Sequence, residues 1–121
     1  MIYYEDLLSV PYKAGGRDLN GLDCYGLVLE CCKRAGCPIP DLAEGQTEMQ
    51  ACKAVNYFGS LGIKETAHPV KNGLVQCEDL KGNLHIAFLL NKTTVLHCTY
   101  AGVKLSPLFY LHNPKYFKVI K

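Results

Sequence analysis

The sequence has no long apolar run and no recognisable export signal. Its longest apolar stretch, Leu84 to Leu90, has the length of a strand, whereas a helix that spans a membrane needs about 20 apolar residues. The N-terminal residues Met1 to Asp6 include two acidic side chains and lack the basic start and apolar centre of a secretory signal peptide. We therefore expect no membrane span and cytoplasmic synthesis, so that delivery to a target outside the cell would depend on other components.

The chain also lacks a strong excess of charge of either sign. Thirteen Lys and Arg residues against eleven Asp and Glu give a net charge of +2, which is too weak to favour binding to nucleic acid or to a membrane surface. No segment is low in complexity, so disorder is not expected. With 121 residues, of which 49% are hydrophobic, the chain fits a single domain over residues 1–121 with a small core.

Cysteine, by contrast, is frequent. The chain has seven cysteines, but an odd number without a signal peptide does not indicate a disulfide framework. Zinc sites usually use pairs of the CxxC type, and that spacing is absent from the cluster near the N-terminal third. We expect neither a metal ion nor another cofactor, and a core position for Cys31 and Cys32, with a zinc-binding module as the alternative. The clustered residues are Cys24, Cys31, Cys32 and Cys37.

The clearest helical pattern runs from Cys24 to Ala35, where apolar residues recur at intervals of three and four. Asp23 is a suitable N-cap and Gly36 suits the residue after the helix. Two other helices are expected, at Ile2–Leu8 and Glu44–Tyr57. The apolar positions of the main helix are Cys24, Leu27, Val28, Cys31, Cys32 and Ala35.

After Lys71 the pattern is typical of strands joined by short connections, which favour antiparallel neighbours. Helices followed by a run of strands indicate an α+β architecture, with helices packed on one face of an antiparallel sheet of about five strands. The expected strands are Gly73–Cys77, Leu84–Leu90, Thr94–Tyr100, Gly102–Leu105 and Tyr116–Ile120.

Cys24 is a candidate nucleophile because it opens a helix after a glycine-rich loop. The backbone N–H groups of a first helical turn stabilise a thiolate, which a cysteine nucleophile requires. Such a thiolate usually acts with an imidazole, and His85 and His97 lie in neighbouring expected strands. A two-residue turn at Asn91-Lys92 would place the two histidines on opposite faces, and a three-residue turn would place them on the same face. In the second register the small Ala87 beside His85 would leave room for a helix. A single histidine there would indicate a half-buried strand residue, but two on one face, in a chain with a cysteine that opens a helix, favour a functional pair.

Several motifs follow one another in a fixed order along the chain. They are Pro11-Tyr12-Lys13-Ala14-Gly15-Gly16, Gly21-Leu22-Asp23-Cys24-Tyr25-Gly26-Leu27-Val28, Asn83-Leu84-His85-Ile86-Ala87-Phe88, Val95-Leu96-His97-Cys98-Thr99 and Gly102-Val103. Together they resemble the NlpC superfamily of papain-like cell-wall cysteine peptidases, from residue 11 to about residue 106. In that family a tyrosine and two glycines precede an Asp-Cys-Ser-Gly-Leu type of helix start, and two strands carry the base and a third polar residue.

The resemblance implies a papain-like α+β fold and hydrolysis of amide bonds in peptidoglycan stem peptides without a cofactor. Carried over by position, Cys24 is the nucleophile and His85 the base. His97 is the polar group that orients the imidazole of His85. Tyr12 lines the site near the sulfur and helps to bind substrate.

The residues on either side of Cys24 are also expected at the substrate site, with Asp23 acting mainly as a helix cap. Tyr25 stands where many members have serine, and an aromatic residue there resembles the branch found in phage tail-assembly and prophage proteins. That likeness implies phage tail proteins as partners and delivery to the cell wall in a tail particle. Two other departures are Asn72-Gly73-Leu74-Val75, where a Gly-Asp-Leu-Val strand start is common, and Ala87, where a glycine is usual.

Three other functions remain open on the sequence. The chain could be a non-catalytic tail or assembly protein that keeps the fold. It could be an amidase or thioesterase that acts on another acyl bond, since the same residues serve several acyl transfers. The third is the zinc-binding module, which a metal analysis would test.

Overall fold

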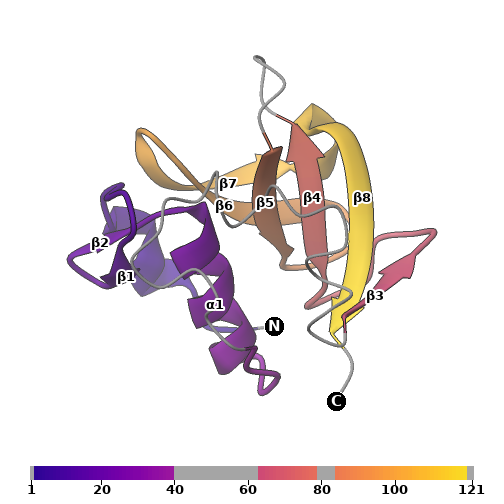
Figure 1. Cartoon of the computed structure of the whole chain (residues 1–121), viewed down its shortest axis with the longest axis horizontal. Coiled ribbons are helices and arrows are strands. Elements are labelled where there is room, and N and C mark those ends of the chain that lie inside the picture. The colour runs from indigo at the N-terminus through magenta and orange to yellow at the C-terminus, as the bar shows by residue number, and fades with distance from the viewer. Residues whose placement is uncertain (1, 40–62, 79–83, 120–121) are drawn as a thin grey trace.

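The computed structural model of the chain describes residues 2–39, 63–78 and 84–119. These residues form an α+β arrangement in which an α-helix lies against one side of an antiparallel sheet (Figure 1). In chain order the elements are η1 (Glu5–Ser9), β1 (Arg17–Asp18), β2 (Gly21–Leu22), α1 (Cys24–Arg34), β3 (Ile63–Thr66), β4 (Leu74–Glu78), β5 (Leu84–Leu89), β6 (Thr94–Thr99), β7 (Gly102–Pro107), η2 (Leu108–Tyr110) and β8 (His112–Val119).

The main sheet has six strands in the order β3-β8-β4-β5-β6-β7, and every neighbouring pair is antiparallel. The five expected strands are all present as β4 to β8, but the expected sheet of about five strands is wrong because β3 adds a sixth at the edge. β3 has only four residues, of which two are charged, so it carries little of the alternation that identifies a strand. The separate ladder of β1 and β2 has two residues per strand and is too short for any periodicity.

The helix expected from Cys24 to Ala35 is confirmed as α1. It is followed by Gly36 with a φ of 79°, the left-handed conformation that glycine adopts most readily after a helix. The helix expected at Ile2–Leu8 is wrong, because the segment forms the 3₁₀ helix η1 at Glu5–Ser9. Tyr4 provides no side-chain cap there, and such a short segment suits 3₁₀ geometry. The helix expected at Glu44–Tyr57 lies outside the described residues.

None of the helices in the described parts of the chain has the length and apolar character that crossing a membrane requires.

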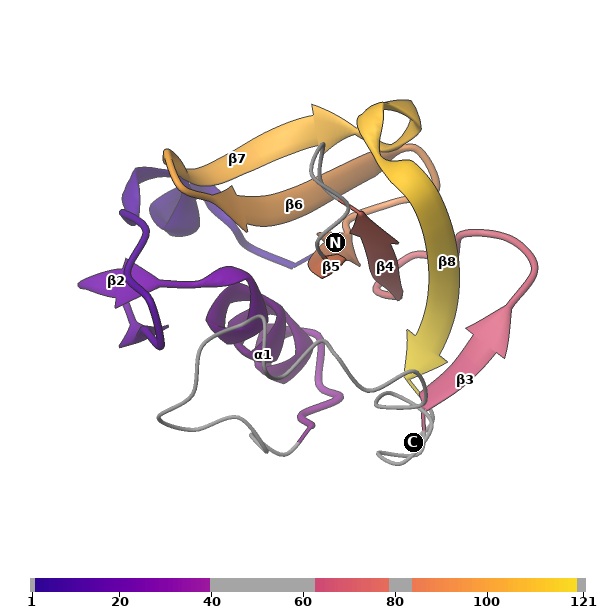
Figure 2. The same ribbon diagram turned by 45° about the horizontal axis from the view of Figure 1, so that its top comes forward.

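Apolar residues fill both faces of the sheet. Figure 2 shows α1 alongside β6, and it packs against both β5 and β6. The side chains on the α1 face of these two strands are Ile86, Phe88, Leu96 and Cys98. The other face carries Val75, Cys77, Ala87, Leu89 and Val95, which are covered by Leu108, Leu111 and Tyr116.

The expectation that Ala87 makes room for the helix is therefore wrong. Ala87 is fully buried in the second cluster, whereas the helix packs in one cluster with Ile86 and Phe88 of β5. Side chains alternate between the two faces of a strand, so the small residue beside His85 faces away from the body of α1. Ala87 instead fits the core formed with β4, β6 and β8.

Candidate active site

The connection between β5 and β6 decides the register of the two histidines. The backbone N–H of Leu90 donates to the carbonyl oxygen of Thr94 at 3.0 Å, which leaves a three-residue connection. Asn91 stabilises this turn, because its Oδ1 accepts a hydrogen bond from the backbone N–H of Thr94 at 2.9 Å. The three-residue register is the one that places His85 and His97 on the same face.

The two histidines are in direct contact. Nε2 of His85 lies 3.0 Å from Nδ1 of His97, and the ring planes meet at 69° with centroids 5.2 Å apart. The other ring nitrogen of His97, Nε2, lies 2.8 Å from Oγ of Ser106 in β7. The side chains therefore form a continuous row from β5 through β6 to β7.

The sequence motifs did not identify Ser106 as a site residue, although the short turn between β6 and β7 indicates which face of β7 it occupies. Thr99 pairs with Gly102, and this register places Ser106 opposite Val95. Val95 and His97 point to the same face because they are two residues apart. A serine on that face of β7 is diagonal to the histidine, at a separation that side chains can bridge.

Burial holds the pKa of His97 below its usual value of 6.5, and the positive charge of Lys104 lowers it further. Lys104 lies directly opposite His97 in the β6–β7 ladder. His97 is therefore neutral near neutral pH and carries one ring proton. A neutral imidazole has one donor and one acceptor nitrogen, so the contacts of His97 with His85 and Ser106 have opposite directions.

Cys24 is the first residue of α1 and is 1% exposed. The segment just before it is joined to β6, because the thiol of Cys98 donates to the carbonyl oxygen of Leu22 at 3.1 Å. Cys98 directly follows His97, and Leu22 lies two residues before Cys24. The start of α1 is therefore positioned on β6 at the level of the second histidine, and α1 also packs on β5.

Asp23 fixes the start of α1. Its Oδ1 accepts hydrogen bonds from the backbone N–H of Gly26 at 2.7 Å and from Nη1 of Arg17 at 2.8 Å, while Oδ2 accepts from the backbone N–H of Gly15 at 3.0 Å. The first of these bonds confirms the expected helix cap. The other two join the glycine-rich loop to the residue next to Cys24.

A close approach of two glycines completes this joint. A methyl group on Gly26 would lie 2.2 Å from the carbonyl oxygen of Gly16, a distance that excludes any other residue at position 26 unless the loop moves. Gly26 therefore lets the loop contact the first turn of the helix. Gly26, the glycine of the Asp-Cys-Tyr-Gly sequence, is therefore needed for the packing of the helix start against the loop.

The three predicted substrate-contacting residues have different exposures. Tyr12 is partly buried, and its ring meets that of Tyr100 edge to face at a centroid distance of 4.9 Å. Tyr25 and Asp23 are both 0% exposed. The guanidinium carbon of Arg17 lies 5.3 Å from the ring centroid of Tyr25. Tyr12 thus retains surface that a substrate could reach, while Asp23 and Tyr25 support the loop and the helix start from inside.

Four of the other thiols in the described residues, those of Cys31, Cys32, Cys77 and Cys98, are buried in the core. The six cysteines in the described residues are free, and Cys31 and Cys32 are buried on α1 as expected. Burial raises the pKa of the Cys32 thiol to about 12 and raises that of Cys31 as well, so both stay protonated. Within residues 2–39, 63–78 and 84–119, no group of three or more metal-binding side chains stands together.

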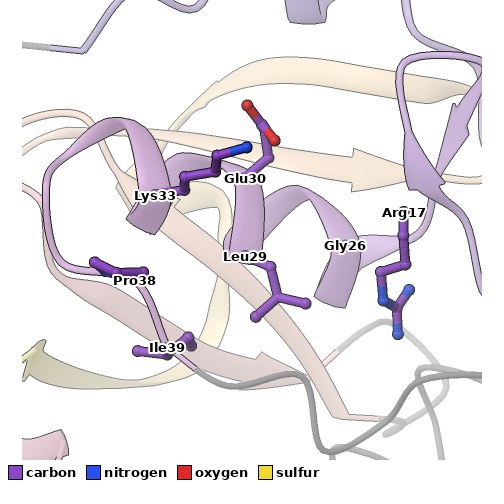
Figure 3. Close-up of a pocket in the computed structure, with 7 residues that line it drawn as sticks. All are labelled: Arg17, Gly26, Leu29, Glu30, Lys33, Pro38 and Ile39. Atoms are coloured by element: carbon purple, nitrogen blue, oxygen red, sulfur yellow. The ribbon is translucent and has the colours of Figure 1, made fainter.

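A separate pocket of about 300 Å³ lies beside α1 (Figure 3). Its charged residues are of mixed sign, and neither histidine of the pair is among the described residues that line it. The lining residues are Arg17, Gly26, Leu29, Glu30, Lys33, Pro38 and Ile39. Gly26 and Arg17 also belong to the joint around Asp23, so the pocket borders the support of the helix start.

Residues 9–120 match the NlpC/P60 family. The matched range contains the helix start, both histidines and Ser106. No curated protein matches the chain at a significant level. Because the family match spans far more than half of the 121 residues, the chain belongs to the NlpC/P60 family.

Proposed function

We propose that the protein is a cysteine peptidase or amidase that hydrolyses amide bonds in peptidoglycan stem peptides. Membership of the NlpC/P60 family supports a cell-wall peptidase or amidase type of function in general. The observation that carries the specific proposal is the 3.0 Å contact between His85 and His97, on strands against which the helix that opens with Cys24 is packed.

The contact between the histidines supports a different role for each ring nitrogen of His85. Because Nε2 of His85 faces His97, Nδ1 is the nitrogen that would act on the thiol of Cys24. His97 would hold the plane of the His85 ring and stabilise its protonated form. Cys24, His85 and His97 would then act as the nucleophile, the base and the group that orients the base.

In the first half of the reaction, the Cys24 thiolate would attack the amide carbonyl carbon and form a carbon–sulfur bond. The carbonyl oxygen would become an oxyanion, and the backbone N–H of Cys24 at the start of the helix would stabilise it. The tetrahedral intermediate would then collapse with cleavage of the carbon–nitrogen bond. The leaving amine would take the proton from Nδ1 of His85, and a thioester on Cys24 would remain.

In the second half, water would attack the thioester while Nδ1 of His85 takes its proton. Cleavage of the carbon–sulfur bond would release the carboxylic acid and regenerate the thiolate and the protonated imidazole. No oxidant, reductant or metal ion is needed for this balance. Tyr12, which retains exposed surface near the start of α1, would help to bind the stem peptide.

A phage tail is the proposed setting. The support is the aromatic Tyr25 after the nucleophile, and the proposal makes phage tail proteins the partners that deliver the enzyme to the wall. Recovery of the protein with assembled tail particles would support this setting. Its absence from such particles would exclude it without affecting the proposed chemistry.

One observation favours a second candidate, a non-catalytic tail assembly protein with the same fold. Cys24 is only 1% exposed, so a substrate reaches the sulfur only if neighbouring groups move. An amidase or thioesterase acting on another acyl substrate would use the same residues and differ only in the products.

The test is digestion of purified peptidoglycan and stem tetrapeptides by the reduced protein, with products identified by mass spectrometry. Cys24→Ala removes the proposed nucleophile, and Cys32→Ala is the matched control because it changes a buried thiol of the same helix. Cleavage by the wild type and by Cys32→Ala, but not by Cys24→Ala, is the expected result. No cleavage by wild-type protein whose Cys24 is shown to be reduced would overturn the proposal.

A further inference from the structure

We propose that Ser106 is a positioning residue that fixes the tautomer of His97, with the proton on Nε2 and the lone pair of Nδ1 directed at His85. The inference rests on the proposed function, because the tautomer matters only if His85 is the base. The geometry is direct: Oγ of Ser106 lies 2.8 Å from Nε2 of His97, on the ring edge away from His85.

The direction of the hydrogen bonds follows from the state that the reaction requires. A protonated His85 donates through both of its ring nitrogens. Its Nε2–H therefore needs an acceptor at Nδ1 of His97, and the single proton of a neutral His97 then sits on Nε2. Oγ of Ser106 then accepts a hydrogen bond from the Nε2–H of His97, and the serine O–H can point in another direction because a hydroxyl both donates and accepts.

The opposite tautomer would block the base. With its proton on Nδ1, His97 would donate to Nε2 of His85, and His85 could not be protonated there. Nδ1–H of His85 would then be the only proton on that ring, and the ring would stay neutral. The thiolate–imidazolium pair would lose its cation.

The surroundings of His97 favour a neutral ring with a fixed proton. Lys104 faces it from β7, and His85 faces it from β5. Cys77 lies opposite His85 on β4, and Tyr116 on β8 packs against the core cluster that contains Cys77. Burial and Lys104 both lower the pKa of His97, so the neutral ring carries one N–H, which can donate a hydrogen bond to Ser106.

The tautomer is measurable without any substrate. Nitrogen-15 chemical shifts of the imidazole rings in full-length protein distinguish Nε2–H from Nδ1–H. We expect the Nε2–H form of His97 in the wild type, a loss of this preference in Ser106→Ala, and its recovery in Ser106→Thr, which keeps the hydroxyl. Leu105→Ala is the matched control, because Leu105 is the preceding residue of β7 and its side chain points to the other face.

The rate measurement connects the tautomer to the reaction. For Ser106→Ala we expect kcat/KM on the stem peptide to fall by about 3- to 10-fold, the effect of losing one neutral hydrogen bond, mainly through kcat. The apparent pKa for alkylation of Cys24 should rise, because the imidazolium that stabilises the thiolate is weakened. Thermal unfolding of each variant shows whether the fold is retained.

An Nδ1–H form of His97 in the wild type would overturn the inference. So would an Nε2–H preference that persists unchanged in Ser106→Ala. Absence of any peptide cleavage by the wild type, together with a tautomer that depends on Ser106, would overturn the proposed function and leave the tautomer assignment intact.

Discussion

Removal of the Asp23 carboxylate tests how the start of α1 is held. In Asp23→Ala, the backbone N–H of Gly26 loses its cap and that of Gly15 loses its acceptor. Arg17 loses the carboxylate to which it is bonded at 2.8 Å, although its side chain is 20% exposed and can be partly hydrated. Arg17 also keeps its bond to the carbonyl oxygen of Gly16.

The size of the effect follows from these three losses. Loss of a helix cap costs about 1 kcal/mol, and loss of the bond to the Gly15 N–H costs about 1 kcal/mol. The charged bond to Arg17 contributes about 1.5 kcal/mol, the lower end for such bonds because the guanidinium is partly exposed. We therefore expect Asp23→Ala to lower the free energy of unfolding by about 3 to 4 kcal/mol. Asp23→Asn keeps the cap acceptor and should lose about half as much.

Urea unfolding followed by far-ultraviolet circular dichroism measures these differences, since the chain has no tryptophan to report by fluorescence. Asp18→Ala is the matched control. Asp18 lies in β1, five residues before Asp23, and among the described residues its carboxylate accepts an exposed bond from the backbone N–H of Asn20 alone. The control should change stability by less than about 0.5 kcal/mol. If Asp23→Ala were no less stable than Asp18→Ala, the assignment of Asp23 as the anchor of the helix start would be refuted.

Three further changes have defined outcomes. Asp6→Asn should remove the contribution that the Asp6 carboxylate makes to the free energy of unfolding. This contribution is present above pH 3.8 and is lost as the pH falls through the pKa of Asp6, which the hydrogen bond from Arg34 lowers. Measuring the free energy of unfolding of both proteins over a series of acidic pH values checks this. His97→Gln should reduce the fall in stability below pH 6.5, because the lowered pKa of His97 makes the unfolded chain bind more protons there; urea unfolding at about pH 8 and about pH 5 compares the two proteins. Gly26→Ala should destabilise the protein by at least about 1 kcal/mol, because the added methyl overlaps the Gly16 carbonyl, and an unchanged melting temperature would contradict the close approach.

Local sequence signals predicted the elements that carry the candidate site. Asp23 and Gly36 mark the ends of α1, and the apolar repeat between them specifies the buried face. The residues around Asn91 allowed two registers, and only the three-residue turn, closed by the Asn91 side chain, places the histidines together. The alternation of side chains reduced the possible registers of His85 and His97 to two, and the geometry of the turn determines which of the two forms.

The features that sequence patterns missed depend on contacts between distant segments. β3 becomes a strand by pairing with β8, about fifty residues later in the chain. The sequence predicts Tyr25 at the substrate site, but its ring is enclosed and lies against Arg17. It also predicts that Ala87 leaves room for a helix, yet the helix packs on the other face of β5. Each of these depends on which distant segment pairs or packs with the element, and the element's own residues do not specify that.

The most direct test of the central claim is to trap the acyl group on Cys24. The protein is mixed with stem peptide, quenched in acid within the first turnover, digested and analysed by mass spectrometry. We expect the peptide containing Cys24 to gain the mass of the acyl half of the substrate. The adduct should be absent in Cys24→Ala and should form far more slowly in His85→Ala. Cleavage that proceeds unchanged in Cys24→Ala, or an acyl group found on another residue, would contradict the role of Cys24 as the nucleophile.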